Sequence, residues 1–281
     1  MHIPRAWAKA NGECTTADNR KLSVAVWGWG QEEASAKREA STRLARLIDR
    51  IRRGDPFPDG YAYGSRPLRE EILETFSGES EDQPNAVITR NRYGAMVLNT
   101  SRLLFLDVDL APPTLAQRLR RLFTASRSPG DEIALAKLRD ALREFGRATF
   151  RLYRTAAGLR AIAIDREFDP AGRDAQELMQ ATGTDPAFVR LCLAQKSFRA
   201  RLTPKPWRCK CPLPPGEHPR GEELVRQQFA AWLDRYDLAS AKYATCRYLE
   251  TIGSSSLKGA AERLVALHDR VTRCDASLPL A

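Results

Sequence analysis

Hydrophobic and polar positions alternate in the short segments of this chain and follow a helical period in the longer ones. Residues 22–28 alternate and end at Gly28, which predicts a strand that closes in a tight bend. Residues 31–53 repeat apolar side chains at helical spacing opposite an arginine-rich face, and Gly54 and Pro56 follow as stop signals. The N-terminal part therefore predicts a strand followed by a long helix with a basic outer face.

Further extended segments occupy the middle of the chain. Residues 86–90 and 95–99 flank a short turn, as do residues 149–155 and 159–165, so two β-hairpins are predicted. Residues 103–109 are the most apolar of these segments, which indicates a central strand covered on both faces.

Helical spacing returns between and after these strands. It predicts helices over residues 66–77, 114–124, 131–145, 172–182, 186–199, 221–245 and 258–271. Strands thus concentrate before residue 166 and helices after it, which is the pattern of an α+β protein. We expect an α+β core over residues 1–170 and a mainly helical, basic region over residues 171–281 that packs on it.

The balance of charge narrows the kind of partner. Lysine and arginine number 45 against 35 aspartates and glutamates, which leaves a formal net charge of +10 on 281 residues. This excess favours a polyanion such as nucleic acid or a nucleotide, and a basic solvated surface is the alternative. Because 43% of the residues are hydrophobic, the chain is able to bury a core, which excludes a mainly disordered protein.

Targeting and redox signals are sparse. No run approaches the roughly 18 consecutive apolar residues of a membrane helix, and the N-terminus has no apolar signal-peptide segment. The six cysteines do not form a compact disulfide framework. We therefore expect a cytoplasmic protein with reduced thiols and no membrane partner.

The residues with the clearest chemical potential are Asp107 and Asp109. In a strand, residues i and i+2 point to the same face, so both carboxylates project side by side from the end of the apolar strand. Such a pair repels itself unless a cation or arginines intervene. A divalent metal, Mg²⁺ or Mn²⁺, is the simplest functional explanation and suits nucleotidyl or phosphoryl transfer. The alternative is that the acids pair with nearby arginines.

The turn of the second hairpin carries small residues between two arginines. Thr155 and Gly158 belong to this turn, and Arg154 and Arg160 flank it. Small side chains allow a ligand close to the backbone, and arginine binds phosphate through two donors at once. These four residues are therefore candidates for binding a nucleotide or phosphate. An ordinary β-turn with exposed arginines is the other interpretation.

Residues 103–165 resemble the core of archaeo-eukaryotic-type primases and primase-polymerases. The apolar strand that ends in Asp107 and Asp109 resembles the first motif of that superfamily, and the turn before Arg160 resembles its second. The resemblance implies an RNA-recognition-motif-like (RRM-like, ferredoxin-like) antiparallel sheet and primase-polymerase-like nucleotidyl transfer. It also implies that Asp107 and Asp109 bind metal, with Asp165 as a third acid. Arg160 stands where the family has a phosphate-binding histidine.

Other functions compete with this enzyme. Arginine binds phosphate but does not act as a neutral base, so Arg160 also fits a non-catalytic nucleic-acid-binding protein with a degenerate primase-like core. Haloacid-dehalogenase phosphatases also have a strand ending in DxD, but that strand lies early in their chains. A protein–protein adaptor with a basic surface is a third alternative. The whole chain also resembles a group of uncharacterised bacterial proteins, chiefly through residues 203–208, which implies no activity.

A long acid-free segment is the third candidate surface. Residues 187–210 contain no aspartate or glutamate, and aromatic side chains are interleaved with the cations. Cations neutralise backbone phosphates and exposed rings stack on bases, so the segment favours nucleic-acid binding unless its rings belong to the core. Together with the first hairpin it supplies the candidate nucleic-acid-binding residues Arg90, Arg92, Arg190, Lys196, Arg199, Arg201, Lys205, Trp207 and Arg208.

A zinc site is not favoured by the cysteine spacing. Cys209, Cys211 and His218 lie close in sequence, but structural zinc usually has two cysteine pairs, each spaced by two to four residues. We therefore do not expect zinc, and Mg²⁺ or Mn²⁺ remains the expected cofactor.

Overall fold

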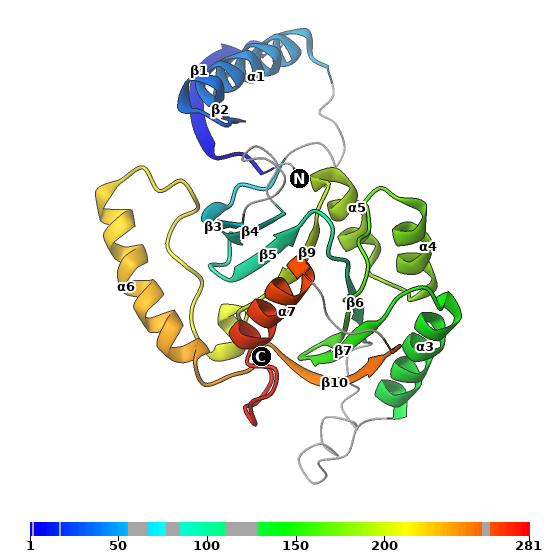
Figure 1. The fold of residues 1–281 in the computed structure, drawn as a ribbon. Helices are drawn as coiled ribbons and strands as arrows, with labels where there is room; N and C mark the ends of the chain where they lie inside the picture. Colours follow the sequence, from blue (N-terminus) through cyan, green and yellow to red (C-terminus); the bar gives the residue numbers. More distant parts are fainter. Residues whose placement is uncertain (2, 17, 56–66, 77–84, 111–128, 255–258) are drawn as a thin grey trace.

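The computed structural model describes the chain except for residues 2, 17, 56–66, 77–84, 111–128 and 255–258. The described part is an α+β protein with six α-helices and three antiparallel sheets (Figure 1). Among its helices, none combines the length and the apolar character that crossing a membrane requires. The helix predicted over residues 114–124 lies outside the described residues.

The N-terminal unit is a β-hairpin covered by one long helix. It consists of β1 (Ala6–Thr15), β2 (Lys21–Gly30) and α1 (Glu33–Arg53). α1 lies directly against β2, because a Cβ atom on Gly28 would come within 2.1 Å of the backbone nitrogen of Ala40. α1 ends where Gly54 adopts a left-handed conformation with a φ of 71°. The predicted strand and helix are confirmed, whereas the sequence pattern does not reveal β1.

The first of two four-stranded sheets has the strand order β3-β4-β5-β9. Its strands are β3 (Glu71–Phe76), β4 (Ala86–Arg90), β5 (Met96–Thr100) and β9 (Phe198–Arg201). The predicted first hairpin is confirmed as β4 and β5. The helix predicted over residues 66–77 is wrong, because β3 pairs with β4 as an edge strand. In so short a segment, the stabilisation gained from pairing with β4 exceeds the weak helical preference of the sequence.

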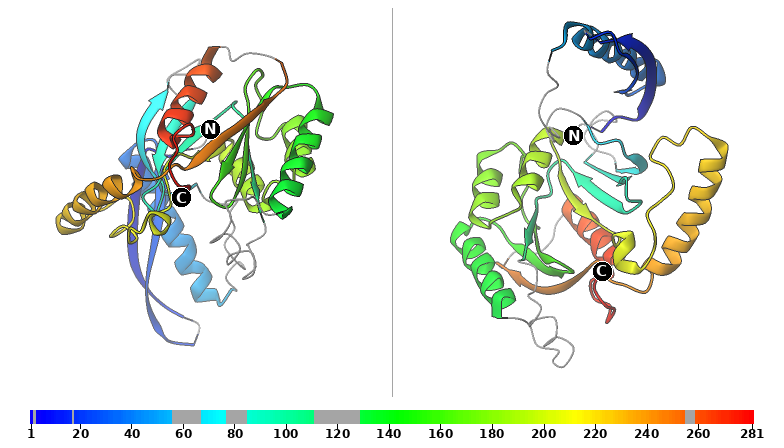
Figure 2. Two further views of the ribbon diagram at one scale, coloured as in Figure 1. Left: turned by 90° about the horizontal axis from the view of Figure 1, so that it is seen from below. Right: turned by 180° about the vertical axis from the view of Figure 1, so that it is seen from behind.

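The second four-stranded sheet has the order β10-β7-β8-β6. Its strands are β6 (Phe105–Asp109), β7 (Phe150–Thr155), β8 (Gly158–Ala163) and β10 (Cys246–Ile252). One face is covered by α3 (Pro129–Phe145) and α4 (Arg173–Ala181), and the other by α7 (Gly259–Thr272) (Figures 1 and 2). β6 is an edge strand and not a central one, yet Phe105 and Leu106 are fully buried because both faces are covered.

The C-terminal part contributes strands as well as helices. α5 (Pro186–Gln195) ends at Lys196, whose φ of 48° is left-handed, so the predicted helix over residues 186–199 is too long and its last residues begin β9. The next elements are the 3-10 helix η1 (Pro206–Cys209) and α6 (Glu223–Ser240). Because β9 and β10 enter the two sheets, each sheet contains strands from both sides of residue 170.

One hydrophobic core joins the two four-stranded sheets. Leu98 of β5, Phe105 of β6 and Phe198 of β9 belong to the same buried cluster. A second, smaller cluster lies between η1 and α6 and includes Cys209 and Trp232. The two clusters fix the position of η1 relative to the sheets, which matters for the site described next.

Candidate functional site

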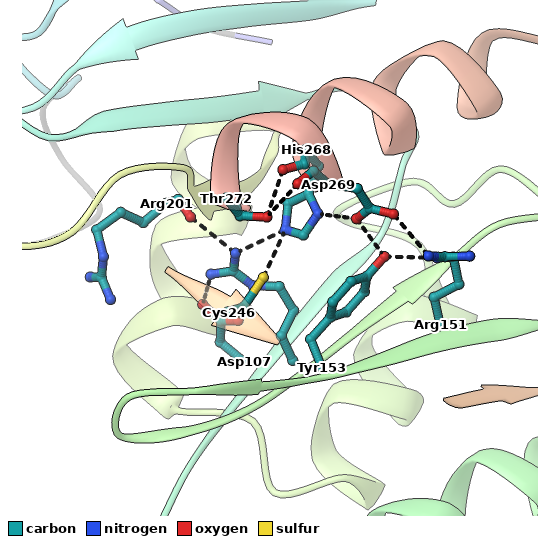
Figure 3. A network of polar contacts seen from close by, with 9 residues as sticks. Asp107, Arg151, Tyr153, Arg201, Cys246, His268, Asp269 and Thr272 are labelled. Atoms are coloured by element: carbon teal, nitrogen blue, oxygen red, sulfur yellow. Dashed lines mark hydrogen bonds and ion pairs between the residues drawn. The ribbon is translucent and has the colours of Figure 1, made fainter. Parts of the chain in front are cut away.

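β6, β8 and β7 place three polar side chains in one row across the second sheet. Asp107 is the cross-strand partner of Arg160, and Arg160 is the partner of Tyr153. Directly opposed residues share one face of a sheet, so the three side chains lie on the face covered by α7. Figure 3 shows this row within a network of polar contacts that extends to α7.

Arg160 and Asp107 form a bidentate ion pair at the centre of the network. Nε of Arg160 lies 2.8 Å from Oδ1 of Asp107, and Nη2 lies 3.0 Å from Oδ2. Nη1 of Arg160 donates to the backbone carbonyl oxygen of Arg201 at 3.1 Å. Arg160 is only 1% exposed, so its guanidinium is not placed to bind a phosphate from solution. Its role in this structure is to neutralise Asp107, which is the alternative that the sequence left open for the two acids.

His268 of α7 extends the network. Its Nε2 lies 3.2 Å from Nη1 of Arg160, which is only able to donate, so Nε2 accepts and the proton of the neutral ring resides on Nδ1. Nδ1 lies 2.8 Å from Oδ1 of Asp269, which accepts that proton's hydrogen bond. Burial lowers the pKa of His268 and the charge of Arg160 lowers it further, whereas the hydrogen bond to Asp269 opposes the shift. The ring is therefore neutral near pH 7.

Asp269 anchors the other end of the network. The Tyr153 hydroxyl donates to Oδ1 of Asp269 at 2.8 Å, and Nη2 of Arg151 donates to Oδ2 at 2.9 Å. Burial acts to raise the pKa of Asp269, but the hydrogen bond from His268 and the charge of Arg151 outweigh it and keep that pKa below its usual value. His268 and Arg160 are 108 residues apart, so no local sequence signal reveals that they meet.

The predicted phosphate-binding turn is held by internal contacts. Nη2 of Arg154 donates to Oδ2 of Asp131 on α3 at 3.0 Å, and Nη1 donates to the carbonyl oxygen of Gly158 at 3.0 Å. The Thr155 hydroxyl oxygen accepts from the backbone nitrogen of Gly158 at 2.9 Å. A Cβ atom at Gly158 would lie 2.2 Å from the backbone oxygen of Val108, so glycine is required for β6 and β8 to approach. These residues therefore build the turn.

The three predicted catalytic acids do not come together. Asp109 opposes Gly158 at the start of β8 and is exposed, whereas Asp165 follows the end of β8, where its Oδ1 accepts from the backbone nitrogen of Thr149 at 2.8 Å. The intervening strand separates the two acids by about 20 Å. Asp165 is therefore not placed to share a metal with Asp107 and Asp109. In the described part of the chain, no three His, Cys, Asp or Glu side chains are grouped to hold a metal ion.

Arg199 of the acid-free segment is buried inside the first sheet. Its Nη2 donates to both carboxylate oxygens of Glu70 at 2.7 and 2.9 Å, and its Nη1 donates to Oδ1 of Asn99 at 2.6 Å. Both ends of the Arg199–Glu70 ion pair are less than one-tenth exposed. Arg199 therefore stabilises the sheet and is not placed to contact nucleic acid, which corrects the prediction.

Three other predicted nucleic-acid-binding residues lie in two different settings. Arg90 is mostly buried, and its Nη1 donates to the carbonyl oxygen of Gly94 within the β4–β5 turn at 3.0 Å. Arg190 on α5 and Lys196 at its end are exposed. Arg90 thus supports its own hairpin, whereas Arg190 and Lys196 contribute to the basic surface.

The cations of residues 201–208 gather near the end of β6. The pKa of Lys205 is lowered by burial and also by the charges of Arg201 and Arg208, whereas Asp109 acts in the opposite direction. The four charges therefore lie near one another. The Nε atom of Arg201 is buried and has no hydrogen-bond partner. Among the described residues, no carboxylate forms an ion pair with Arg201, Lys205 or Arg208. The acid-free sequence thus becomes a local excess of positive charge.

Two aromatic rings, the exposed Trp207 and the half-buried Tyr93, lie beside these cations. Trp207 of η1 is 50% exposed, and its ring meets that of Tyr93 edge-on, with the ring centres 5.2 Å apart. The guanidinium of Arg92 lies 4.7 Å from the centre of the Tyr93 ring, and Nζ of Lys205 lies 5.3 Å from the centre of the Trp207 ring. We call Arg92, Tyr93, Lys205 and Trp207 the aromatic platform. The platform joins the tip of the β4–β5 hairpin to η1, a contact between distant segments that the sequence alone does not reveal.

α6 supports the platform from within. The Tyr236 hydroxyl donates to the carbonyl oxygen of Pro204 at 2.6 Å, just before η1. The Trp232 ring stacks on the Tyr236 ring at 5.0 Å, and Trp232 Nε1 donates to the carbonyl oxygen of Pro212 at 2.8 Å. These contacts hold both ends of the η1 segment, so Trp207 is displayed from a fixed backbone.

The cysteines considered for zinc belong to this supporting cluster. Cys209 and Cys211 are buried, and Sγ of Cys209 donates to the carbonyl oxygen of Pro206 at 3.2 Å. Burial raises the pKa of both thiols, which disfavours the thiolate form that zinc requires. All six cysteines of the chain are free and buried.

Comparison of the chain with protein-family models, with curated proteins and with solved structures finds no match. The functional conclusion therefore rests on two features of the structure. One is the closed ion pair of Asp107 with Arg160, and the other is the aromatic platform near Arg201 and Arg208, which form no ion pair with the described carboxylates.

Proposed function

We propose that this protein binds single-stranded nucleic acid through the aromatic platform and does not catalyse a reaction on it. The observation that carries the proposal is the pairing of the exposed Trp207 ring with the half-buried Tyr93 ring, in which each ring has a cation beside it. Bases stack on exposed aromatic rings, and cations neutralise the phosphates that follow each base. Unstacked bases are available only in a single strand, which decides between single- and double-stranded ligands.

The ion pair between Asp107 and Arg160 favours binding over catalysis. A carboxylate that accepts two hydrogen bonds from one buried guanidinium has its charge neutralised and its oxygens oriented toward that partner. A pair of metal ions would have to compete with Arg160 for Asp107. The degenerate primase-like core is therefore the version of the family resemblance that we adopt.

The fold supports this resemblance in one half of the sheet. Among the described elements, β6, α3, β7 and β8 follow one another as strand, helix, strand and strand, and β8 lies between β6 and β7. An RRM-like sheet has this arrangement but places its fourth strand beside the first. Here β10 pairs with β7 instead. An RRM-like core with a relocated fourth strand, in a cytoplasmic protein with free thiols, is thus part of the proposal.

Substitution of Trp207 tests the proposed function. In fluorescence anisotropy with a labelled single-stranded oligonucleotide, Trp207→Ala is expected to weaken binding about 5- to 150-fold, because stacking on one aromatic side chain contributes about 1–3 kcal/mol. Trp207→Phe keeps a ring and is expected to retain most of the affinity. Raising the salt concentration is expected to weaken binding of the unaltered protein steeply.

Leu238→Ala on α6 is the matched control, since Leu238 is an exposed hydrophobic residue outside the platform. It is expected to leave the affinity unchanged. Equal affinity of Trp207→Ala and the unaltered protein, or absence of oligonucleotide binding at low salt, contradicts the proposed function.

A metal-dependent nucleotidyl or phosphoryl transferase is the second candidate function. It is favoured by the exposure of Asp109 and the one-third exposure of the Asp107 side chain, on one face of β6 and near Lys205. In this alternative, Asp107 and Asp109 bind Mg²⁺ or Mn²⁺, and a phosphate of the nucleic acid or nucleotide lies against the nearby cations.

Manganese binding distinguishes the two functions. If the protein is non-catalytic, we expect calorimetric titration with Mn²⁺ to give the same result for the unaltered protein and for Asp109→Asn. We also expect no incorporation of labelled nucleotide into a primed template. Asn keeps the shape of the side chain and removes its charge. Mn²⁺ binding lost in Asp109→Asn, together with metal-dependent incorporation, establishes the transferase instead.

A further inference from the structure

Arg201 forms no ion pair with a carboxylate of the described residues. It ends β9, and its backbone carbonyl oxygen accepts from Arg160 at 3.1 Å, which fixes the backbone there. Its own Nε atom is buried and makes no hydrogen bond. Figure 3 shows its side chain turned away from the network around Arg160. A buried guanidinium nitrogen that makes no hydrogen bond is costly unless a ligand accepts from it.

The surroundings of Arg201 increase this need for an anion. The pKa of Arg201 is lowered to about 10, chiefly by burial and also by the charges of Arg160 and Arg208, whereas Asp107 acts in the opposite direction. Asp107 is already bound to Arg160 by two contacts. Arg201, Lys205 and Arg208 therefore carry three positive charges against Asp109, which leaves an excess of two near the end of β6.

We propose that Arg201, Lys205 and Arg208 form a binding site for a phosphomonoester, the doubly charged phosphate at the end of a nucleic acid strand or on a free nucleotide. Two negative charges match the local excess, whereas a phosphodiester within a strand supplies only one. The planar guanidinium of Arg201 suits two parallel hydrogen bonds to one phosphate group. This inference rests on the proposed function, because it defines which part of the nucleic acid the basic segment recognises.

Lys205 connects the phosphomonoester site to the aromatic platform. Its ammonium group lies over the Trp207 ring and is also near the charges of Arg201 and Arg208. A nucleotide whose base stacks on Trp207 therefore has its phosphate within reach of these cations. The arrangement favours recognition of a terminal nucleotide, with its base on the platform and its phosphate at Arg201.

The test compares oligonucleotides of one sequence that carry a 5′-phosphate, a 3′-phosphate or hydroxyl groups at both ends, with a nucleoside monophosphate as a separate probe. The unaltered protein is expected to bind one of the phosphorylated strands about tenfold or more tightly than the hydroxyl-ended strand. Arg201→Gln is expected to remove this difference while still binding the hydroxyl-ended strand. Arg263→Gln, at an exposed arginine of α7, is the matched control and is expected to keep the difference.

The outcomes separate this inference from the proposed function. Equal binding of all three strands by the unaltered protein overturns the phosphomonoester site and leaves nucleic-acid binding standing. Binding of the nucleoside monophosphate that depends on Arg201, without binding of any strand, supports the site, assigns it to free nucleotides and contradicts the proposed function. Absence of binding to every probe overturns both. Urea unfolding of Arg201→Gln verifies that the variant is folded.

Discussion

Replacing Asp107 with alanine is expected to lower the free energy of unfolding by about 3–5 kcal/mol, because it leaves the charge of Arg160 buried without its counter-ion. Arg160 is 1% exposed and directs three of its nitrogen atoms to Asp107, Arg201 and His268. After the substitution, only the carbonyl oxygen of Arg201 and the ring nitrogen of His268 remain as acceptors. Urea unfolding at pH 7 measures the loss as a lower transition midpoint.

Asp109→Ala is the matched control for this experiment. Asp109 lies on the same strand and the same face but is exposed, so its removal is expected to change the unfolding free energy by no more than about 0.5 kcal/mol. The paired variant Asp107→Leu with Arg160→Met is expected to recover much of the stability, because it replaces both charges by apolar groups. A loss of less than 1 kcal/mol in Asp107→Ala would show that Arg160 is not confined as the structure has it.

Replacing Arg199 with alanine is expected to cost about 3–5 kcal/mol of unfolding free energy as well, because Glu70 then stays buried without its counter-ion. Arg199 donates two hydrogen bonds to Glu70 and one to Asn99, and it links the approach to β3 with β5 and β9. At a temperature where the variant is folded, its affinity for single-stranded nucleic acid is expected to equal that of the unaltered protein.

Arg190→Ala provides the comparison for Arg199. Arg190 belongs to the same acid-free segment but is exposed on α5, so its removal is expected to leave the stability unchanged. Urea unfolding and anisotropy measured on both variants separate the two roles of arginine. A stable Arg199→Ala variant with weakened nucleic-acid binding would place Arg199 on the binding surface and refute the buried network.

Most elements of the fold were predictable because their signals are local. The hairpin of β4 and β5 and that of β7 and β8 follow from alternation on either side of a turn. The helix predicted over residues 66–77 was wrong because strand and helix patterns differ little over so few positions. β9 escaped detection because its four residues continue the apolar pattern of α5, and only the left-handed Lys196 separates them.

The candidate site was predictable only in part. The acid-free segment and the extended course of the chain around Trp207 were predictable, since charge and proline content are properties of neighbouring residues, whereas the exposure of Trp207 was left open. The different settings of Arg199 and Arg201 were not predictable, because the two arginines project from the same face of β9 and differ only in what packs against them there. The meeting of Tyr93 with Trp207 depends on contact between two segments far apart in the chain.

From the sequence alone it follows that this is a basic α+β protein, that Asp107 and Asp109 share one face of a buried strand, and that residues 187–210 contain cations and no acidic residue. Spacing and composition are enough for such statements. Which of these charges are neutralised depends on the tertiary structure. The pairing register of β6 with β8 sets Asp107 opposite Arg160, and the packing of α7 brings His268 to the same guanidinium. Register and packing depend on contacts between distant residues, which no local pattern encodes.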